Sequence, residues 1–236
     1  PRPPTRSPPR RARYRWRVTR IISGRAGSLT LEVPASGTRP TSDRVRESLF
    51  SALESSDSIR DAAVLDLFAG SGALGLESAS RGAAAVTLVE RSAAAAAIAK
   101  RNAAKVARAL GGSPAAKVKA TSVIAYLRGA TETFDLVFID PPYDLGDDEL
   151  REALTLLVPR LSAHATVIIE RAGRSAEPPL PDGLEHLRNK KEMRFLTSVD
   201  ADLGYRNTLA ERATVAGDRL LETDTPVLYS GVPVQP

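Results

Sequence analysis

An apolar stretch of the chain ends abruptly in an acidic, proline-containing tetrapeptide. The sequence FDLVFIDPPYD covers residues 134–144, and its tetrapeptide is Asp140, Pro141, Pro142 and Tyr143. The Asp140 carboxylate and the Pro141 carbonyl can accept hydrogen bonds from the two N–H groups of an exocyclic base amine. These bonds would make the lone pair of the amine nitrogen available for attack. The prolines fix the backbone, and Tyr143 can stack on the base. The tetrapeptide therefore suits methylation of a base amine, with an ordinary turn as the plain alternative.

A glycine-rich turn is the second candidate site. The segment DLFAGSGALG, residues 66–75, carries Gly70, Gly72 and Gly75 in the spacing G-x-G-x-x-G, and Glu90 ends the next apolar run. Glycines at such a turn let a ligand approach the backbone closely, and an acid at the end of the next strand can hold ribose hydroxyls. The combination predicts a cofactor that contains a nucleoside.

Asp66 indicates which cofactor. It lies just before the turn, where the pyrophosphate of a dinucleotide would bind at the N-terminus of the following helix. A carboxylate there would repel a pyrophosphate, but it would attract the cationic ammonium and sulfonium groups of S-adenosylmethionine. Asp66 therefore favours S-adenosylmethionine, and an NAD-dependent oxidoreductase is the weaker alternative.

Alternating strands and helices are expected to position these residues. After a β-hairpin at 19–34 and a helix at 39–55, strands are expected at 63–68, 84–90, 116–120, 134–140 and 165–170, with helices up to residue 81 and at 92–110, 122–128 and 147–158. This alternation predicts an α/β fold with a doubly wound, mostly parallel, Rossmann-like sheet. Ligands bind beyond the carboxyl ends of such strands, so Asp140 and the glycine turn should share one edge. Beyond residue 170 the periodicity weakens, and no element is predicted.

Composition excludes several kinds of chemistry. The 236 residues include no Cys and two His. Disulfides, thiolate metal sites and a cysteine nucleophile for methylation of pyrimidine carbon five are therefore excluded, and no metal site is expected. No membrane span or signal peptide is expected either, which predicts a cytoplasmic protein.

Positive charge is concentrated in two segments. Residues 1–25 hold nine Arg and no acid, although the net charge of the whole chain is only +5. Within them the Arg- and Pro-rich residues 1–17 are predicted to be disordered, either as an RNA-gripping arm or as a segment upstream of an alternative start at Val18. Residues 91–131 hold eight Lys or Arg and no acid. This block is a candidate footprint for a polyanion, with a solvated helix face as the alternative.

Five segments together resemble the bacterial RsmD family of 16S ribosomal RNA guanine-N2 methyltransferases. They are TRIISGRAG, GTRPTSDRVRESLFSAL, VLDLFAGSGALGLESASRGA, VTLVE and FDLVFIDPPY, between about residues 19 and 170. The resemblance implies a class I S-adenosylmethionine-dependent methyltransferase. It also implies a monomer whose partner is ribosomal RNA or the assembled small ribosomal subunit.

The resemblance also implies roles for single residues. The cofactor pocket would be lined by Asp66, Phe68, Ala69, Gly70, Ser71, Gly72 and Gly75. Glu90 would hold the ribose, and Arg91 would flank the adenine. The methionine end would be covered by Arg39, Pro40, Thr41, Arg46 and Glu47. The target amine would be held by Asp140, Pro141, Pro142 and Tyr143.

Both ends of the chain depart from the family pattern. The Arg-rich arm is extra, and the YGDT-like strand of the family has only partial counterparts in GYRNT at 204–208 and AGDRL at 216–220. The expected organisation is an arm over 1–17, a hairpin over 18–38 and a methyltransferase domain over 39–236, poorly defined after 170. Two further functions stay open: a DNA adenine or cytosine amine methyltransferase, and a non-catalytic RNA-binding assembly factor.

Deletion of residues 1–17 is expected to leave the affinity for S-adenosylmethionine unchanged, because none of them belongs to the expected pocket. The affinity for RNA should become less dependent on salt, since each Arg that contacts a phosphate displaces counterions. Calorimetry and RNA binding at several salt concentrations measure the two effects. Loss of folding or of cofactor binding in the truncated protein would show that the arm is structural.

Overall fold

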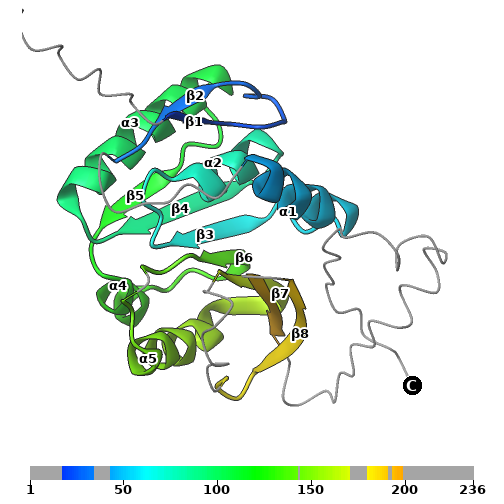
Figure 1. The fold of residues 1–236 in the computed structure, drawn as a ribbon, viewed down its shortest axis with the longest axis vertical. Coiled ribbons are helices and arrows are strands. Elements are labelled where there is room, and N and C mark those ends of the chain that lie inside the picture. Colours follow the sequence, from blue (N-terminus) through cyan, green and yellow to red (C-terminus); the bar gives the residue numbers. More distant parts are fainter. Residues whose placement is uncertain (1–17, 35–42, 143, 171–179, 191–192, 199–236) are drawn as a thin grey trace, which may run out of the picture.

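A central sheet organises the protein, shown as a computed structural model in Figure 1. The structure describes residues 18–34, 43–142, 144–170, 180–190 and 193–198, and within them the sheet has seven strands. In spatial order they are β5 (Lys117–Ala120), β4 (Ala85–Glu90), β3 (Ala63–Leu67), β6 (Phe134–Ile139), β7 (Leu161–Glu170), β9 (Met193–Ser198) and β8 (Leu184–Lys190). The first five are parallel to one another, whereas β9 is antiparallel to both β7 and β8.

Helices cover both faces of this sheet. One face carries α1 (Asp43–Ser55), α2 (Ala73–Ser80) and α3 (Ala93–Ala109), and the other carries α4 (Val123–Gly129) and α5 (Asp147–Leu157), with the 3-10 helix η1 (Val158–Arg160) leading into β7. Successive strand residues alternate between the two layers: Val64 packs with the first and Leu65 with the second. This is the doubly wound arrangement predicted from the alternating pattern. None of the helices in the described segments has the length and hydropathy needed to cross a bilayer.

The predicted elements up to residue 170 are confirmed, apart from shifts at their ends. β7 begins at Leu161, earlier than the expected residue 165, and the described part of the first helix begins at Asp43. β8 and β9 were not predicted. β9 pairs with β7 through contacts such as Ile168 opposite Phe195, which a local pattern cannot reveal. Residues 1–17 and the partial look-alikes at 204–208 and 216–220 lie outside the described residues.

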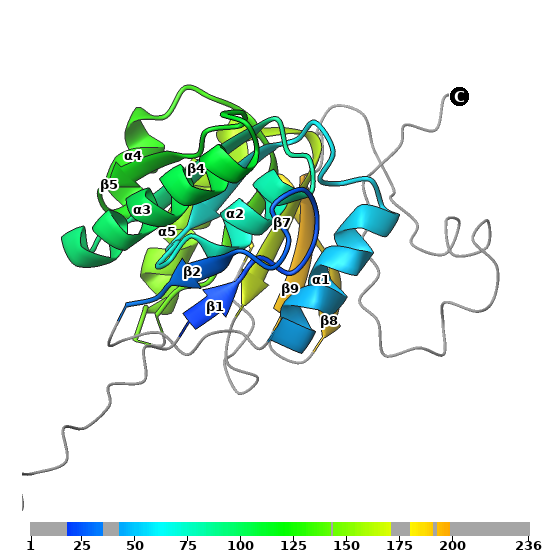
Figure 2. The ribbon, with the colours of Figure 1, turned by 90° about the horizontal axis from the view of Figure 1, so that it is seen from above.

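A buried carboxylate fixes the N-terminal hairpin to the sheet domain. The hairpin pairs β1 (Val18–Arg20) with β2 (Thr30–Glu32), and Figure 2 shows it on the side of α2 and α3. Glu77 of α2 is fully buried, and its two carboxylate oxygens accept from the N–H groups of Ile22 at 2.7 Å and Ser23 at 3.0 Å. The Arg81 Nε donates to the same carboxylate at 2.8 Å. Because a buried charge needs such partners, the hairpin and α2 are held in one arrangement.

Gly75 lets α2 pack closely on the sheet. A Cβ at this position would lie 2.5 Å from Leu88 Cδ2 and 3.0 Å from Val86 Cγ1. We expect Gly75→Ala to lower the free energy of unfolding by about 1–3 kcal/mol, because the added methyl group overpacks this contact. Urea denaturation measures the change.

Gly129→Ala in α4 is the matched control, since a Cβ there would have no neighbour within 4 Å. It should be neutral or stabilising by up to about 1 kcal/mol, from helix propensity alone. If Gly75→Ala were as stable as Gly129→Ala, the close approach of α2 to the sheet would be refuted.

Candidate active site

A large open pocket lies at the carboxyl edge of the sheet, where β3, β4, β6 and β7 end. Its volume is about 1090 Å³. The predicted site residues that line it are Arg46, Asp66, Phe68, Ala69, Gly70, Ser71, Glu90, Arg91, Asp140, Pro141 and Pro142. The fold thus brings the glycine turn and the acidic tetrapeptide to one cavity, at the expected edge.

Other predicted site residues do not line this pocket. Gly72 and Gly75 lie beneath the loop, where a Cβ on either would collide with the Leu88 side chain. Their lack of a side chain serves the turn and its packing, and their predicted contact with a cofactor stays a prediction. Glu47 is exposed on α1 and is not part of the pocket wall, and its predicted role at the methionine end stays a prediction. Arg39, Pro40, Thr41 and Tyr143 lie outside the described residues.

The glycine turn is held in an unusual backbone conformation. Phe68, Gly70 and Gly72 have φ values of 63°, 54° and 79°. A positive φ is uncommon for a bulky residue such as Phe68 and persists only where the surroundings fix it. Here the next N–H, that of Ala69, donates to the Val89 carbonyl at 2.9 Å. Such stored strain is typical of a functional loop.

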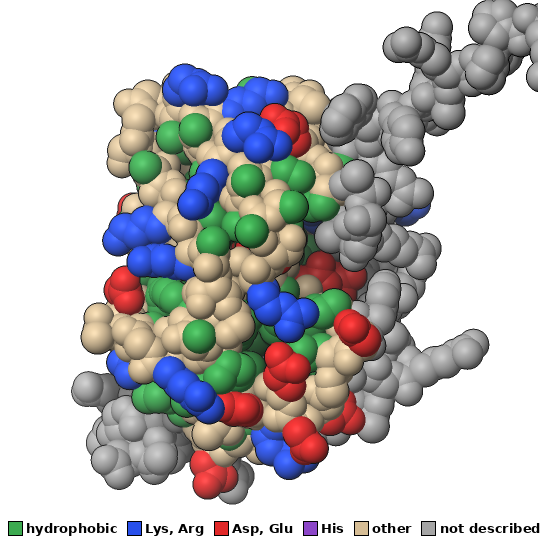
Figure 3. Space-filling view, turned by 90° about the vertical axis from the view of Figure 1, so that its left-hand side faces the viewer, with side chains coloured by type: hydrophobic (Ala, Val, Ile, Leu, Met, Phe, Trp, Pro, Cys, Tyr) green, Lys and Arg blue, Asp and Glu red, His purple; other side chains and the backbone are tan. Residues whose placement is uncertain are grey.

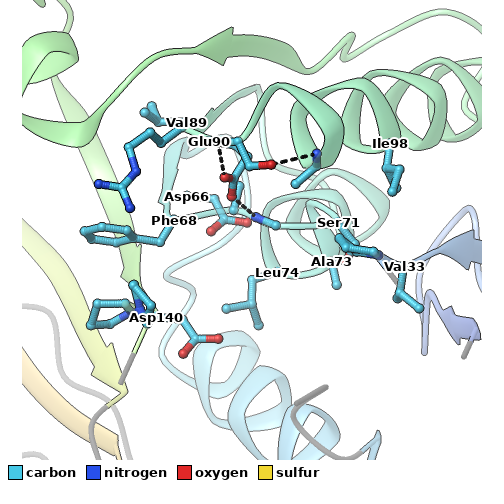
Figure 4. Close-up of a pocket in the computed structure, with 18 of the residues that line it drawn as sticks. Val33, Asp66, Phe68, Ser71, Ala73, Leu74, Val89, Glu90, Ile98 and Asp140 are labelled. Atoms are coloured by element: carbon cyan, nitrogen blue, oxygen red, sulfur yellow. Dashed lines mark hydrogen bonds between the residues drawn. The ribbon is translucent and has the colours of Figure 1, made fainter. Parts of the chain in front are cut away.

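Glu90 ties this loop to the start of α3. Its Oε2 accepts from the Gly70 N–H at 2.9 Å, and its Oε1 accepts from the Ser92 N–H at 2.6 Å (Figure 4). Each carboxylate oxygen can accept more than one hydrogen bond. These two hydrogen bonds orient the Glu90 carboxylate. It can still accept further hydrogen bonds from the hydroxyl groups of a ligand.

Two further carboxyl groups at the pocket have raised pKa values. Burial raises the pKa of Asp66 to about 7, and the nearby Glu90 adds to the effect, although the Gly75 N–H at 2.9 Å opposes it. Enclosure by the pocket raises the pKa of Asp140 to about 7, with further contributions from Glu170 and Asp66. Asp140 remains accessible to solvent in the pocket mouth, which moderates this rise. Both carboxylates would be stabilised by a cationic ligand.

Arg46 supplies the opposite charge. This side chain is 2% exposed, and its Nη2 donates to the Arg20 carbonyl at 2.8 Å and to Asp43 Oδ1 at 2.9 Å. Its Nε and Nη1 have no hydrogen-bond partner among the described residues. Unsatisfied buried donors on a charged group are costly, and a carboxylate is their best complement. The pocket therefore suits a ligand that carries both an ammonium and a carboxylate.

A buried amide joins the glycine loop to the hairpin. Asn102 of α3 is 1% exposed, and its Oδ1 accepts from the Glu32 N–H at 2.9 Å. Its Nδ2 donates to the carbonyls of Glu32 and Ser71, both at 2.9 Å. One side chain thus sets the distance between β2, α3 and the loop, and it was not predicted from the sequence.

Several residues of the pocket wall were also not predicted. They are Thr19, Glu32, Val33 and Pro34 of the hairpin, Ala94, Ala95, Ile98 and Arg101 near or in α3, and Ser122 and Val123 after β5. Ser122 had a usable signal, because it follows a strand that ends at the same edge. Glu32 and Arg101 had no such signal in the sequence, because the two residues that pair here are 69 positions apart. Within the described segments, no group of three or more His, Asp or Glu could hold a metal ion.

Asp66→Asn is expected to stabilise the protein at pH 8. Because the pKa of Asp66 rises from 3.8 to about 7 on folding, the stability of the wild type falls as pH increases between these values and stays lower above them. Asn keeps an oxygen for the Gly75 N–H without the charge. We expect a gain of roughly 1–3 kcal/mol at pH 8 that shrinks toward pH 4. Urea denaturation at several pH values tests this, and a variant less stable than wild type at pH 8 would contradict it.

Comparison with known proteins gives consistent matches. A family described as Conserved hypothetical protein 95 matches residues 19–197. Ribosomal RNA small subunit methyltransferase D of Escherichia coli strain K12 is 38% identical over 165 residues, which cover 69% of this chain and 79% of that protein. The putative rRNA methyltransferase YlbH of Bacillus subtilis is 32% identical over 185 residues, 76% of this chain and 96% of the relative.

A solved structure supports the same relationship. The structure of a putative methyltransferase, yhhF from Escherichia coli, superposes with a TM-score of 0.65 at 34% identity, covering 77% of this chain and 98% of that one. The family match also includes β8 and most of β9. It therefore continues beyond residue 170, where the resemblance noted in the sequence ends.

Proposed function

Because the chain belongs to the family described as Conserved hypothetical protein 95, the RsmD family, we propose that it methylates the exocyclic N2 amine of a guanine in small-subunit ribosomal RNA. The observation that carries the proposal is the placement of Asp140 and Pro141 in the same pocket as the glycine loop. The proposed methyl donor is S-adenosylmethionine.

The charges of the pocket support this cofactor. S-adenosylmethionine would supply a methyl group activated by a sulfonium centre, and it carries an ammonium, a carboxylate and a ribose diol. Asp66 would hold the ammonium, and the Nε and Nη1 of Arg46, which have no partner among the residues that the structure describes, would hold the carboxylate. Glu90 would accept from the ribose hydroxyls, and Arg91 would flank the adenine. A dinucleotide fits less well, because its pyrophosphate would lie near a buried carboxylate.

The acceptors beside Asp140 support amine methylation. The N2 lone pair of guanine is delocalised into the ring, so the nitrogen is a poor nucleophile. Asp140 and the Pro141 carbonyl would accept hydrogen bonds from the two N–H groups of this amine. These bonds would hold the nitrogen in the orientation for attack on the methyl group. With a pKa of about 7 in the free protein, Asp140 is suited to accept the proton that the amine loses. A cationic cofactor would favour the ionised form that accepts these bonds.

RNA is favoured over DNA by the names of the two relatives described above, a ribosomal RNA small subunit methyltransferase and a putative rRNA methyltransferase. Guanine in a loop or single strand can be splayed out into such a pocket. The proposed partner is naked 16S RNA or the assembled small subunit, the proposed state is a monomer, and the proposed compartment is the cytoplasm, where ribosomal RNA is found.

Asp140→Asn is expected to fold and to bind S-adenosylmethionine, but to lose methyl transfer by roughly 100-fold or more. The substitution keeps the size of the side chain and replaces an acceptor by a donor that opposes the incoming amine. Transfer of a labelled methyl group to 16S RNA measures turnover, and calorimetry measures cofactor binding.

Asp148→Asn is the matched control, because Asp148 is a nearby, 94% exposed carboxylate outside the pocket wall. It should retain full activity. Wild-type turnover in Asp140→Asn would refute the proposed mechanism, and labelling of DNA in place of RNA would favour the DNA methyltransferase alternative.

A further inference from the structure

We propose that the surface formed by the hairpin and α3 binds the sugar–phosphate backbone of the RNA substrate. This α3 basic surface consists of Arg25, Lys100, Arg101, Lys105 and Arg108. The inference rests on the proposed function, because it assigns the place where that substrate is held. Only part of the basic block at residues 91–131 belongs to this surface. Arg128 of that block lies on α4, on the other face of the sheet.

Contacts between the hairpin and α3 make this surface continuous. The Arg25 Nη2 donates to the Leu110 carbonyl at the end of α3, at 2.8 Å. The Lys105 Nζ donates to the Thr30 carbonyl of β2 at 2.5 Å. Arg101 forms an ion pair with Glu32 at 2.7 Å. Since Arg101 and Glu32 also line the pocket, the surface extends from the pocket rim to the far end of α3.

The charge pattern of α3 differs from that of an ordinary solvated helix. Its 17 residues contain no Asp or Glu, so no cation on it has an acidic partner along the helix. Lys100 and Arg108 are exposed, and neither forms an ion pair with another described residue. They lie about 12 Å apart along the axis at 1.5 Å per residue. Two exposed cations at this spacing, on a helix without acids, are typical of a surface that follows a phosphate backbone.

The opposite wall of the pocket is acidic. Its lining carboxylates are Asp140, Asp144, Glu149 and Glu170. In Figure 3, Lys and Arg gather over the upper part of the face, where α3 and the hairpin lie, and most Asp and Glu lie in its lower half. Phosphates would be repelled from the α5 side. The RNA chain should therefore approach over α3, and only a neutral base should enter beside Asp140.

Glu32 limits how strongly Arg101 can bind RNA. Both the Nε and the Nη2 of Arg101 donate to Glu32 Oε2, at 3.0 and 2.7 Å. The two side chains are 55% and 57% exposed, and exposed pairs of this kind are weak. A phosphate can therefore displace Glu32. This arrangement predicts opposite effects: Arg101→Gln should weaken RNA binding, whereas Glu32→Gln should strengthen it.

The test uses the full chain and a naked 16S RNA transcript at several salt concentrations. The double variant Lys100→Gln, Arg108→Gln should raise the Kd for RNA about tenfold at low salt and lower the slope of log K against log salt by about 1.4, at 0.7 per lost phosphate contact. Glu32→Gln should lower the Kd severalfold. The affinity of the double variant for S-adenosylmethionine should equal that of wild type.

Arg128→Gln is the matched control, because Arg128 is 65% exposed and paired with Glu152 on the other face. It should bind RNA like wild type. Unchanged RNA binding in the double variant overturns the inference. So does a defect seen with assembled small subunits but not with naked RNA, which would indicate a ribosomal protein as the contact. Failure of the proposed function is recognised separately, because wild-type protein would then transfer no methyl group.

Discussion

The Asn102 side chain makes the interaction on which the pocket depends. Its three hydrogen bonds, each 2.9 Å long, connect the last residue of β2 to the carbonyl of Ser71 in the glycine loop. A buried amide whose groups are paired specifies one arrangement, because each alternative leaves a polar group unsatisfied. Glu90 holds the adjacent residue of the same loop, Gly70, through its N–H. The cofactor loop, the hairpin and α3 therefore keep fixed relative positions before any ligand binds.

This rigid frame concentrates charge that the protein alone does not neutralise. Asp66 and Asp140 have pKa values of about 7, and the Nε and Nη1 of Arg46 have no hydrogen-bond partner in the described part of the chain. Each feature lowers the stability of the empty protein and would be relieved by a ligand of the right charge. Acidic and basic side chains are also separated around the pocket mouth, with acids on the α5 side and cations on the α3 side. The cofactor site and the proposed RNA path thus follow one charge distribution.

Local motifs allowed the sequence to predict the strands, the helices and much of the pocket. Asp66, Glu90 and Asp140 were placed correctly at one edge because each lies at the carboxyl end of a parallel strand or directly after it. The close packing of Gly75 against the sheet was not predicted, because a glycine that packs beneath a loop has the same local pattern as one that faces a ligand. Asn102 was missed because its partners are 31 and 70 positions away. β8 and β9 were missed because their pairing, not their composition, defines them.

The central claim is that Asp140 and Pro141 present the N2 amine of a guanine for methylation. Nucleoside mass spectrometry of 16S RNA treated with the wild-type protein and S-adenosylmethionine tests it most directly. The account predicts N2-methylguanosine as the new nucleoside, at a site in a loop or single strand. Methyl groups on adenine or cytosine amines, or no methylated nucleoside in RNA that the protein binds, would contradict it.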